Sequence, residues 1–322
     1  MKEKRALITG ISGQDGSYLA ELLLEKGYHV WGVLRRHSLP ENQTSRLQKI
    51  FDHPQLTLVY GDVTDFASML YLISNSQPHE IYNLAAQSHV GISFKQPIFT
   101  TNTDALGVLN ILEIVKVTSP KTKIYQACSS EMFGNECDED GYRRETTSMR
   151  PVSPYGCAKL YGFTLGSVYR SSYDIFVSNG ILFNHESPRR GLNFVTNKVV
   201  EGAIKISRGE QEELALGNLE ATRDWGHAKD YVRAMWMMLQ HDKPDDFVCA
   251  MGESHSVREL CELVFSMLDL DYKEYITLDK QYLRPTELHN LRGDCTKLKN
   301  TLGWEPEYNF ESLIKEMVEA RL

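Results

Sequence analysis

A glycine-rich turn near the amino terminus constrains the fold of this chain more than any other feature. Gly10, Gly13 and Gly16 are spaced G-x-x-G-x-x-G, directly after the apolar segment 6–9 and at the start of the amphipathic segment 16–26. Glycines at this spacing let the backbone turn sharply and approach a pyrophosphate, which the N–H groups of the next helix then face. A plain turn is the alternative, but the order strand, turn, helix predicts a dinucleotide-binding unit.

Beyond this turn, short apolar runs alternate with segments of helical periodicity. The pattern predicts strands at residues 6–9, 29–34, 56–60, 80–84, 123–127 and 175–183. It predicts helices at residues 16–26, 67–74, 103–117 and 155–169, with Asp65 and Asp104 as helix-start signals. Such alternation is typical of a parallel sheet covered by helices on both faces.

The second half of the chain has longer polar connections and fewer apolar strands, with helices expected at residues 194–207, 228–240, 257–268 and 310–321. We therefore expect an α/β fold, a Rossmann-type doubly wound parallel sheet with a smaller mixed α/β lobe. The dinucleotide-binding domain is expected over 1–185, with segments returning near 225–255, and the substrate-binding lobe over 186–322. Such a lobe caps the carboxyl ends of the strands, where doubly wound folds bind ligands.

The composition is that of an ordinary soluble globular protein. The chain has 322 residues and a net charge of −8, which argues against nucleic-acid binding. We expect no membrane association, because no apolar run has the length of a signal peptide or a membrane helix. The six cysteines form no C-x-x-C pair, which favours reduced thiols in a cytoplasmic protein over a disulfide framework or a metal site.

Residues at the ends of the predicted strands suggest which dinucleotide binds. Arg35 and Arg36 stand where a site selective for NAD usually has an acidic residue, so we expect them to pair with the 2′-phosphate of NADP. A solvated basic pair is the alternative. Asp62 follows the next strand, at a suitable position for contact with the adenine. Small residues near Leu84 and Gln87 suit a backbone that passes close to the cofactor.

A catalytic group is indicated by Tyr155-x-x-x-Lys159. Residues four apart share one face of a helix, so the lysine can lower the pKa of the tyrosine and make it a general base. The preceding strand ends at Ser129 and Glu131. A simple dehydrogenase needs the hydroxyl but no carboxylate there. Glu131 instead suits removal of an acidic proton beside a sugar ketone, although a surface acid after a strand is the plainer explanation.

Several longer runs are more specific than these motifs: GISGQDGSYLAELLLEKGY, YNLAAQSHVG, SSEMFG, SPYGCAKLYG, GILFNHESPRRG, RDWGHAKDYV and RPTE. With these runs the chain closely resembles the GDP-mannose 4,6-dehydratases, which are extended short-chain dehydrogenases/reductases. The resemblance extends from Ala6 to about Gly303. It implies a redox-neutral enzyme that acts on a GDP-sugar and regenerates its nicotinamide cofactor in each turnover.

The resemblance also implies roles for individual residues. Tyr155, supported by Lys159, initiates oxidation at C4, Glu131 takes the C5 proton, and Ser129 assists proton transfer. The implied cofactor contacts are Gly10, Gly13, Gln14, Asp15, Gly16, Arg35, Arg36, Asp62, Leu84, Gln87, Leu182, His185 and Arg190. The implied substrate contacts are Ser88, Asn184, Lys198, Arg223, Arg284 and Glu287. Arginines also suit a diphosphate, because their forked donors bind it well; surface salt bridges are the alternative for Arg223 and Arg284.

Some positions depart from the family pattern and leave the sugar open. Ser129 stands where the family usually has threonine, Cys128 where it has serine, and Val152 where it generally has arginine. These changes suggest a GDP-manno-heptose as an alternative substrate with unchanged chemistry. A nucleotide-sugar epimerase or 4-dehydrogenase is another alternative, since neither needs Glu131. A non-catalytic NADP-binding regulator is disfavoured because Tyr155 and Lys159 are both present.

The family resemblance further implies an assembly. The segment 35–46 is longer than a tight turn requires, and in the resembling family this loop reaches the cofactor region of a neighbouring subunit. We expect a homo-oligomer, a tetramer, with the helices at 103–117 and 155–169 as dimer faces.

Overall fold

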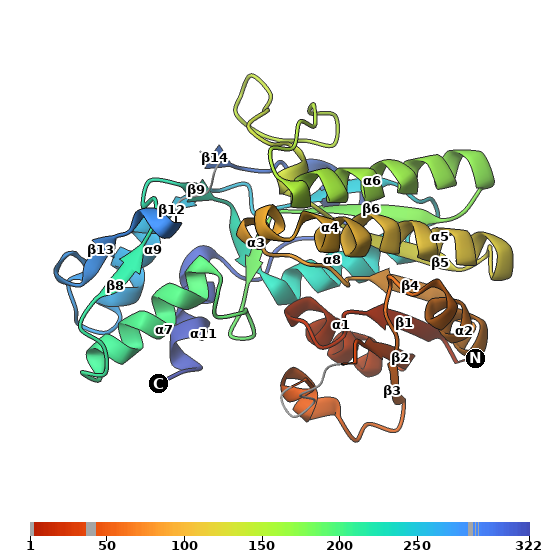
Figure 1. The fold of residues 1–322 in the computed structure, drawn as a ribbon, viewed down its shortest axis with the longest axis horizontal. Helices are drawn as coiled ribbons and strands as arrows, with labels where there is room; N and C mark the ends of the chain where they lie inside the picture. Colours follow the sequence, from red (N-terminus) through yellow and green to blue (C-terminus); the bar gives the residue numbers. More distant parts are fainter. Residues whose placement is uncertain (1–2, 37–42, 283–285, 287, 289) are drawn as a thin grey trace.

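A seven-stranded parallel sheet is the centre of the molecule (Figure 1). The computed structural model describes residues 3–36, 43–282, 286, 288 and 290–322. The strand order is β11-β6-β5-β4-β1-β2-β3. The strands are β1 (Arg5–Thr9), β2 (His29–Leu34), β3 (Leu56–Tyr60), β4 (Glu80–Asn83), β5 (Lys123–Ser129), β6 (Val177–Leu182) and β11 (Asp246–Cys249). The predicted doubly wound fold is confirmed, and the strand order changes direction between β1 and β4.

Both faces of this sheet are buried, because successive side chains of a strand point to opposite sides. Ile8 and Tyr82 pack with helices α1 (Gln14–Glu25) and α8 (Ala228–Gln240). Leu7 and Ile81 face the other way, into a cluster formed with α2 (Phe66–Ser76), α5 (Gly107–Thr118) and α6 (Pro154–Tyr173). The sheet is therefore the middle layer of three.

Most predicted elements are present within a few residues of their expected bounds. Strands β2 and β3 and helix α8 begin and end where the sequence predicts. Asp65 is the N-cap of α2, since its carboxylate accepts hydrogen bonds from the backbone of Ala67 and Ser68.

The prediction that Asp104 starts a helix is wrong. Two short helices, α3 (Val90–Lys95) and α4 (Pro97–Thr101), already precede this residue. Asp104 lies inside the π-helical turn η2 (Asn102–Leu106), which continues directly into α5. Its carboxylate accepts a hydrogen bond from the backbone of Gln87 at 2.7 Å, outside its own helix. A tertiary contact therefore takes the place of the expected N-cap.

A smaller lobe covers one end of the sheet, at the left of Figure 1. Its core is built by α7 (Val195–Ser207), α9 (Val257–Ser266) and α11 (Phe310–Glu319). Three small sheets complete the chain path: β7 (Asn184–Glu186) with β10 (Trp225–His227), β8 (Leu214–Leu216) with β13 (Ile276–Leu278), and β9 (Thr222–Arg223) with β12 (His255–Ser256) and β14 (Asn290–Leu291). The remaining elements are α10 (Thr296–Leu302) and the short turns η1 (Ser45–Ile50), η3 (Ser130–Met132), η4 (Tyr272–Glu274) and η5 (Lys280–Tyr282).

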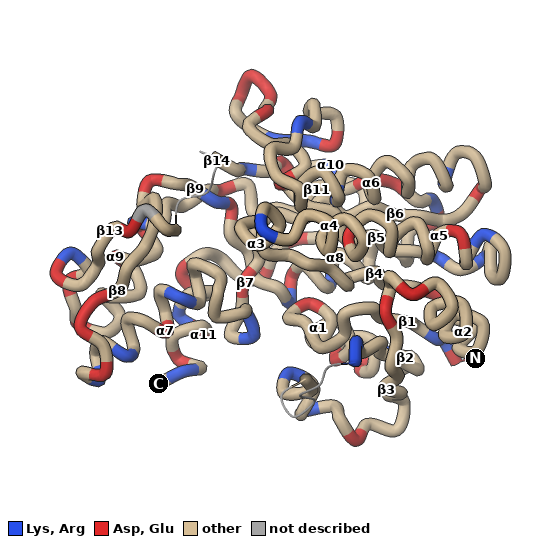
Figure 2. The backbone as a smooth tube through the Cα atoms, viewed as in Figure 1, with Lys and Arg blue, Asp and Glu red and all other residues tan. Residues whose placement is uncertain are grey.

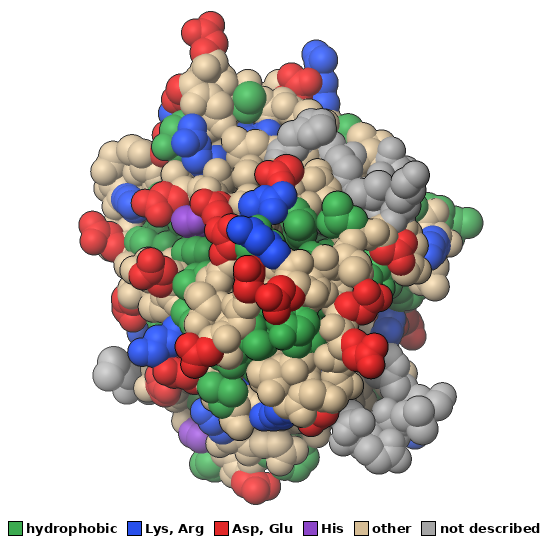
Figure 3. Space-filling view, turned by 90° about the vertical axis from the view of Figure 1, so that its left-hand side faces the viewer, with side chains coloured by type: hydrophobic (Ala, Val, Ile, Leu, Met, Phe, Trp, Pro, Cys, Tyr) green, Lys and Arg blue, Asp and Glu red, His purple; other side chains and the backbone are tan. Residues whose placement is uncertain are grey.

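Charge is distributed over the surface without separation of sign. Acidic and basic residues occur along both lobes (Figure 2). They are interspersed over the end of the molecule formed by the smaller lobe (Figure 3). No helix within the described ranges is long and apolar enough to cross a membrane.

Candidate active site

A cavity of about 1160 Å³ lies where the carboxyl ends of the main strands meet the smaller lobe. Thr9, Arg35, Leu84 and Ser129 line it from the ends of β1, β2, β4 and β5. Residues of the smaller lobe, among them Lys198 and Arg223, close the opposite side. Doubly wound sheets bind their ligands at this edge, next to the point where the strand order reverses.

The glycine turn shapes one end of the cavity. Gly10 has a φ of 71°, a conformation that side chains other than glycine rarely adopt. A Cβ atom at Gly16 would lie 2.3 Å from the carbonyl oxygen of Gly10, so only glycine lets the helix pack this closely on the turn. No side chain caps α1 at Gly13. The N–H groups of its first turn are therefore available to an anion in the cavity.

Tyr155 and Lys159 lie together on α6, buried in the cavity wall. The Lys159 ammonium is 5.7 Å from the centre of the Tyr155 ring and donates a hydrogen bond to the Ala127 carbonyl at 3.0 Å. Burial raises the pKa of Tyr155, while the charge of Lys159 and a hydrogen bond from Ser129 act in the opposite direction. Lys159 thus acts on this pKa in the expected direction, but in the protein without ligands the loss of hydration outweighs the ammonium and the pKa is raised overall.

The Lys159 side chain stays protonated in spite of its burial. Burial lowers its pKa, but the neighbouring Tyr155 and Asp104 more than compensate and the pKa is raised. The cavity wall therefore holds a fixed positive charge beside the tyrosine.

Glu131 reaches the same wall from the end of β5. It belongs to the turn η3, which the Ser129 hydroxyl caps by accepting a hydrogen bond from the Glu131 N–H at 3.2 Å. Its neighbour α6 comes close because Gly156 has no side chain; a Cβ there would lie 2.7 Å from the Glu131 carbonyl. Ser129, Glu131, Tyr155 and Lys159 all line the cavity, as the sequence predicts.

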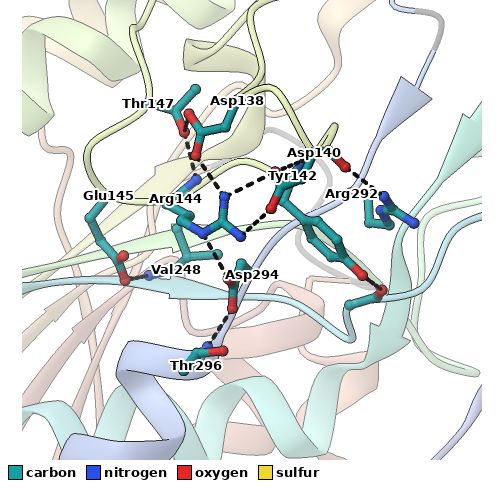
Figure 4. Close-up of polar contacts among 11 residues, drawn as sticks. Asp138, Asp140, Tyr142, Arg144, Glu145, Thr147, Val248, Arg292, Asp294 and Thr296 are labelled. Atoms are coloured by element: carbon teal, nitrogen blue, oxygen red, sulfur yellow. Dashed lines mark hydrogen bonds and ion pairs between the residues drawn. The ribbon is translucent and has the colours of Figure 1, made fainter.

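The connection between Glu131 and Tyr155 is held in place by an ion-pair cluster (Figure 4). The Arg144 guanidinium contacts Asp138 at 2.8 Å, Asp140 at 2.6 Å and Asp294 at 2.8 Å. Next to it, the Glu145 carboxylate accepts the backbone N–H of Val248 in β11 at 2.7 Å. The acidic residues of this connection thus anchor it on the sheet edge and the C-terminal segment.

The structure brings almost all of the predicted cofactor residues together. All of them line the cavity except Arg36. Arg35 lines the cavity and its guanidinium is 5.4 Å from the centre of the Phe99 ring, whereas Arg36 is not among the lining residues and its guanidinium is 5.4 Å from the centre of the Tyr60 ring. The sequence pattern R-R did not distinguish the two, because adjacent residues at a strand end point in different directions.

Four predicted substrate residues, Ser88, Asn184, Lys198 and Arg223, line the cavity. Lys198 donates to the Ala215 carbonyl at 2.7 Å, and its ammonium lies over the Tyr282 ring. Arg223 donates to the carbonyls of Thr222 and Leu288.

The other two predicted substrate residues, Arg284 and Glu287, lie outside the residues that the structure describes. Val152, suspected of changing the charge near the site, packs against a hydrophobic cluster with Met132 and Phe133 and is not among the lining residues.

Sequence analysis missed Asp104 as a residue of this site. Its side chain is buried beneath the cavity wall, and one of its carboxylate oxygens has no hydrogen-bond partner. Burial raises its pKa to about 6, although Lys159 and the Gln87 N–H oppose the shift. π-Helical turns occur often at functional sites. The signal in the sequence was an acidic residue near the start of a predicted helix, which we interpreted as a cap.

The fold and the site together define an extended short-chain dehydrogenase/reductase enzyme. Similar solved structures include a dTDP-glucose 4,6-dehydratase from Bacillus anthracis in complex with NAD, with a TM-score of 0.85, 23% identity and coverage of 98% of this chain and 96% of that chain. Another is a UDP-glucose 4-epimerase from Thermotoga maritima, with a TM-score of 0.85, 25% identity and coverage of 98% of each chain.

The sequence comparisons name the family. The family model described as GDP-mannose 4,6 dehydratase matches residues 7–317. The human GDP-mannose 4,6 dehydratase is 48% identical over 98% of this chain and 90% of its own length. The Yersinia enterocolitica GDP-mannose 4,6-dehydratase is 46% identical over 99% of this chain and 94% of its own length. The chain belongs to the GDP-mannose 4,6-dehydratase family.

The buried carboxylate of Asp104 predicts a measurable pH dependence of stability. Its folded pKa of about 6 is raised, so its contribution to stability is fully present below the ordinary pKa of aspartate and is lost as the pH rises through 6. This loss amounts to about 1 kcal/mol between about pH 5 and about pH 7.5. In Asp104→Asn, which keeps an acceptor for Gln87, urea unfolding should no longer show this loss. The control variant Asp174→Asn, at an exposed position, should lose stability with rising pH as the wild type does. If Asp104→Asn and Asp174→Asn lose stability equally, Asp104 is not the group responsible.

Proposed function

We propose that this protein is a nicotinamide-dependent GDP-mannose 4,6-dehydratase that converts GDP-mannose to GDP-4-keto-6-deoxy-mannose. The observation that carries the proposal is Glu131, a carboxylate that lines the same cavity as Tyr155 and Lys159. A dehydrogenase or an epimerase requires the tyrosine and the lysine but no acid at this position. Family membership over residues 7–317 supplies the substrate class.

The cavity fits a nicotinamide dinucleotide. A Cβ atom at Gly16 would lie 2.3 Å from the Gly10 carbonyl oxygen, so glycine is required for the tight turn that brings the start of α1 to the cavity, where its N–H groups can face a pyrophosphate. When bound, the nicotinamide ring supplies hydride acceptance from C4 of the sugar and hydride return at C6, so the reaction has no net redox change. We propose that Gly10, Gly13, Gln14, Gly16, Arg35, Asp62, Leu84, Gln87, Leu182 and Arg190 contact the cofactor, and that Asp15 and His185 help to hold it as a pair beside its pyrophosphate.

In the proposed mechanism, the side chains of this wall move protons. Tyr155 acts as the phenolate, which the positive charge of Lys159 stabilises; it takes the proton of the C4 hydroxyl and becomes neutral. The C4 ketone acidifies the proton at C5, which Glu131 removes while water leaves from C6. The Ser129 hydroxyl interacts with Tyr155 in the direction that lowers the tyrosine pKa, and it is suited to assist proton transfer at C4 or C6. We propose that Ser88, Asn184, Lys198, Arg223, Arg284 and Glu287 bind the GDP-sugar.

Replacing Glu131 tests the reaction class. Glu131→Gln keeps the size of the side chain but removes the base, so formation of the dehydrated product should fall about 100- to 10,000-fold. Mass spectrometry after incubation with GDP-mannose, without added reductant, measures the loss of one water. Glu136→Gln, on the exposed connection outside the cavity lining, should retain full activity. An unreacted or epimerised sugar with the wild type would contradict the dehydratase assignment.

The same assay with GDP-manno-heptose distinguishes the sugar. Ser129 lacks the methyl group of the threonine usual in the family and so leaves slightly more room at the sugar. Water lost only from the heptose would move the assignment to a GDP-manno-heptose 4,6-dehydratase.

We propose NADP as the cofactor, on the basis of Arg35. Its side chain is exposed at the cavity mouth, beyond the end of β2, where a 2′-phosphate would require a cation. Arg35→Ala should weaken NADP binding about tenfold and leave NAD binding unchanged. Arg36→Ala should have the smaller effect, because its guanidinium lies over Tyr60. Titration of the cofactor-free variants with NADP and with NAD measures the two dissociation constants. An equal loss of affinity for both dinucleotides in Arg35→Ala would exclude a contact between Arg35 and the 2′-phosphate.

We propose that the dinucleotide-binding domain comprises residues 1–185 with the returning segment 225–255, and the substrate lobe the rest of 186–322. This division is supported by β11, which pairs with β6, and by α8, which packs with α1. A cytoplasmic location also remains a proposal, supported by six cysteines that form no disulfide.

We propose a homotetramer whose dimer faces are α5 and α6. Large apolar side chains are exposed on or beside these helices: Leu106, Val117, Tyr161, Val168 and Tyr173. Paired against a second copy, they would be buried. Light scattering of the active protein should give a mass near four chains, and Val168→Glu on α6 should lower it. An active monomer would refute the assembly.

A further inference from the structure

An acidic side chain stands in an unfavourable place at the phosphate-binding end of α1. Asp15 is the acidic residue in the first turn of this helix, and it lines the cavity. A carboxylate near a helix N-terminus interacts well with the helix dipole. It also repels an anion that binds the N–H groups at this end of the helix, and the proposed ligand carries a pyrophosphate there.

The Asp15 carboxylate is paired with His185, which belongs to β7. The Nε2 atom of His185 lies 2.8 Å from Asp15 Oδ2, and its Nδ1 atom lies 2.7 Å from the carbonyl oxygen of Phe183. A carbonyl oxygen can only accept, so Nδ1 must carry a proton. An ionised carboxylate also only accepts, which requires a second proton on Nε2. With both hydrogen bonds formed, the ring is an imidazolium.

Neighbouring side chains hold this geometry from both elements. Gln14 donates to Asp15 Oδ1 at 3.0 Å and to the His185 carbonyl at 3.0 Å, and it accepts a hydrogen bond from Ser187 at 2.8 Å. The His185 ring stacks on Tyr231 of α8, with 4.5 Å between ring centres. The pair is therefore fixed between α1, β7 and α8.

The surrounding charges favour the ionised state of both partners. Burial raises the pKa of Asp15, but His185 outweighs it and the pKa is lowered. Burial lowers the pKa of His185, but Asp15 outweighs this and the pKa is raised, against the opposing charge of Arg190. Arg190 is itself paired with Glu186 at 3.0 Å. Lys159 of α6 also interacts with Asp15.

Two more ionisable groups face the pair from other elements. Tyr125 of β5 is a buried phenol whose pKa is raised well above its usual range, so it contributes no charge. His227 of β10 lies at the N-terminus of α8, and burial lowers its pKa to about 4, so it is neutral at pH 7. The charges that decide the state of His185 are therefore Asp15 and Arg190.

We infer that His185 is held as an imidazolium by Asp15, and that its charge cancels the Asp15 carboxylate at the phosphate-binding end of α1. The inference rests on the proposed function for the cofactor but names a new role within that site. Both ring nitrogens are committed to Asp15 and Phe183, so His185 has no N–H left to donate to the dinucleotide. His185 is a positioning residue that neutralises Asp15.

Cofactor binding by charge-cancelling variants tests this role. His185→Gln leaves the Asp15 carboxylate uncompensated and should raise the dissociation constant for NADP about tenfold. The double variant His185→Gln with Asp15→Asn carries neither charge and should recover most of the affinity. A histidine that contacted the cofactor directly would not be rescued in this way, so a double variant as weak as His185→Gln overturns the inference. The exposed Asp269→Asn, in which asparagine suits the left-handed backbone, is the matched control.

The pH dependence of binding has a definite sign. Because the pKa of His185 is raised, compensation extends to higher pH than an ordinary histidine would allow and is lost as the pH rises through that pKa. The dissociation constant for NADP should therefore increase at alkaline pH in the wild type and remain flat in Asp15→Asn, which has no carboxylate to compensate. The same alkaline increase in both proteins would contradict the inference.

A measurement on the protein without cofactor separates this inference from the proposed function. Proton–nitrogen correlation spectra of the imidazole rings, assigned with His185→Gln, should show two protonated nitrogens for His185 at pH 7. A neutral ring that titrates in the ordinary histidine range would overturn the inference, whatever the cofactor. Failure of the wild type to bind any dinucleotide would instead refute the proposed function and leave this result standing.

Discussion

The close contact between the glycine turn and the first helix governs the arrangement of the whole cavity. A Cβ atom at Gly16 would lie 2.3 Å from the Gly10 carbonyl oxygen, so α1 can pack this closely on the short turn that follows β1 only with glycine at position 16. Strand β1 lies between β4 and β2, at the reversal of strand order. The helix N-terminus is therefore directed into the crevice that opens there, and the other strand ends bring their functional residues around it.

The polar wall of the cavity shows how charge is tolerated away from water. An isolated ion would be strongly disfavoured in such a place, so each buried charge has a compensating neighbour. Lys159 is surrounded by Asp104, Tyr155 and the Ala127 carbonyl. Asp15 is compensated by His185 and Arg190 by Glu186. A charged ligand changes the balance of charge in this wall when it binds. Its affinity therefore depends on the ion-pair partners of the proposed ligand-binding residues as well as on those residues themselves.

Sequence patterns predicted elements well where one physical signal dominated. The bounds of β2, β3 and α8 were correct because their apolar runs or periodicity are bounded by clear polar signals. The helix expected over 103–117 was present, but the cap assigned to Asp104 was not. A polar residue in a helix has the same local appearance whether it caps the helix or bonds to a distant backbone group. The contact with Gln87 decides between the two, and it joins segments that are separated in the chain.

The residues themselves determined the strand–turn–helix unit, the parallel sheet and the set of side chains that gather at its carboxyl edge. These follow from local rules, namely the steric freedom of glycine, the two-residue period of strands and the order of elements along the chain. Tertiary structure decided what no local rule contains: that Arg35 faces the cavity and Arg36 does not, that burial raises the Tyr155 pKa despite Lys159, and that Asp15 meets His185. Side-chain direction, hydration and charge pairing depend on neighbours brought from far along the chain, and only the folded molecule sets those neighbours.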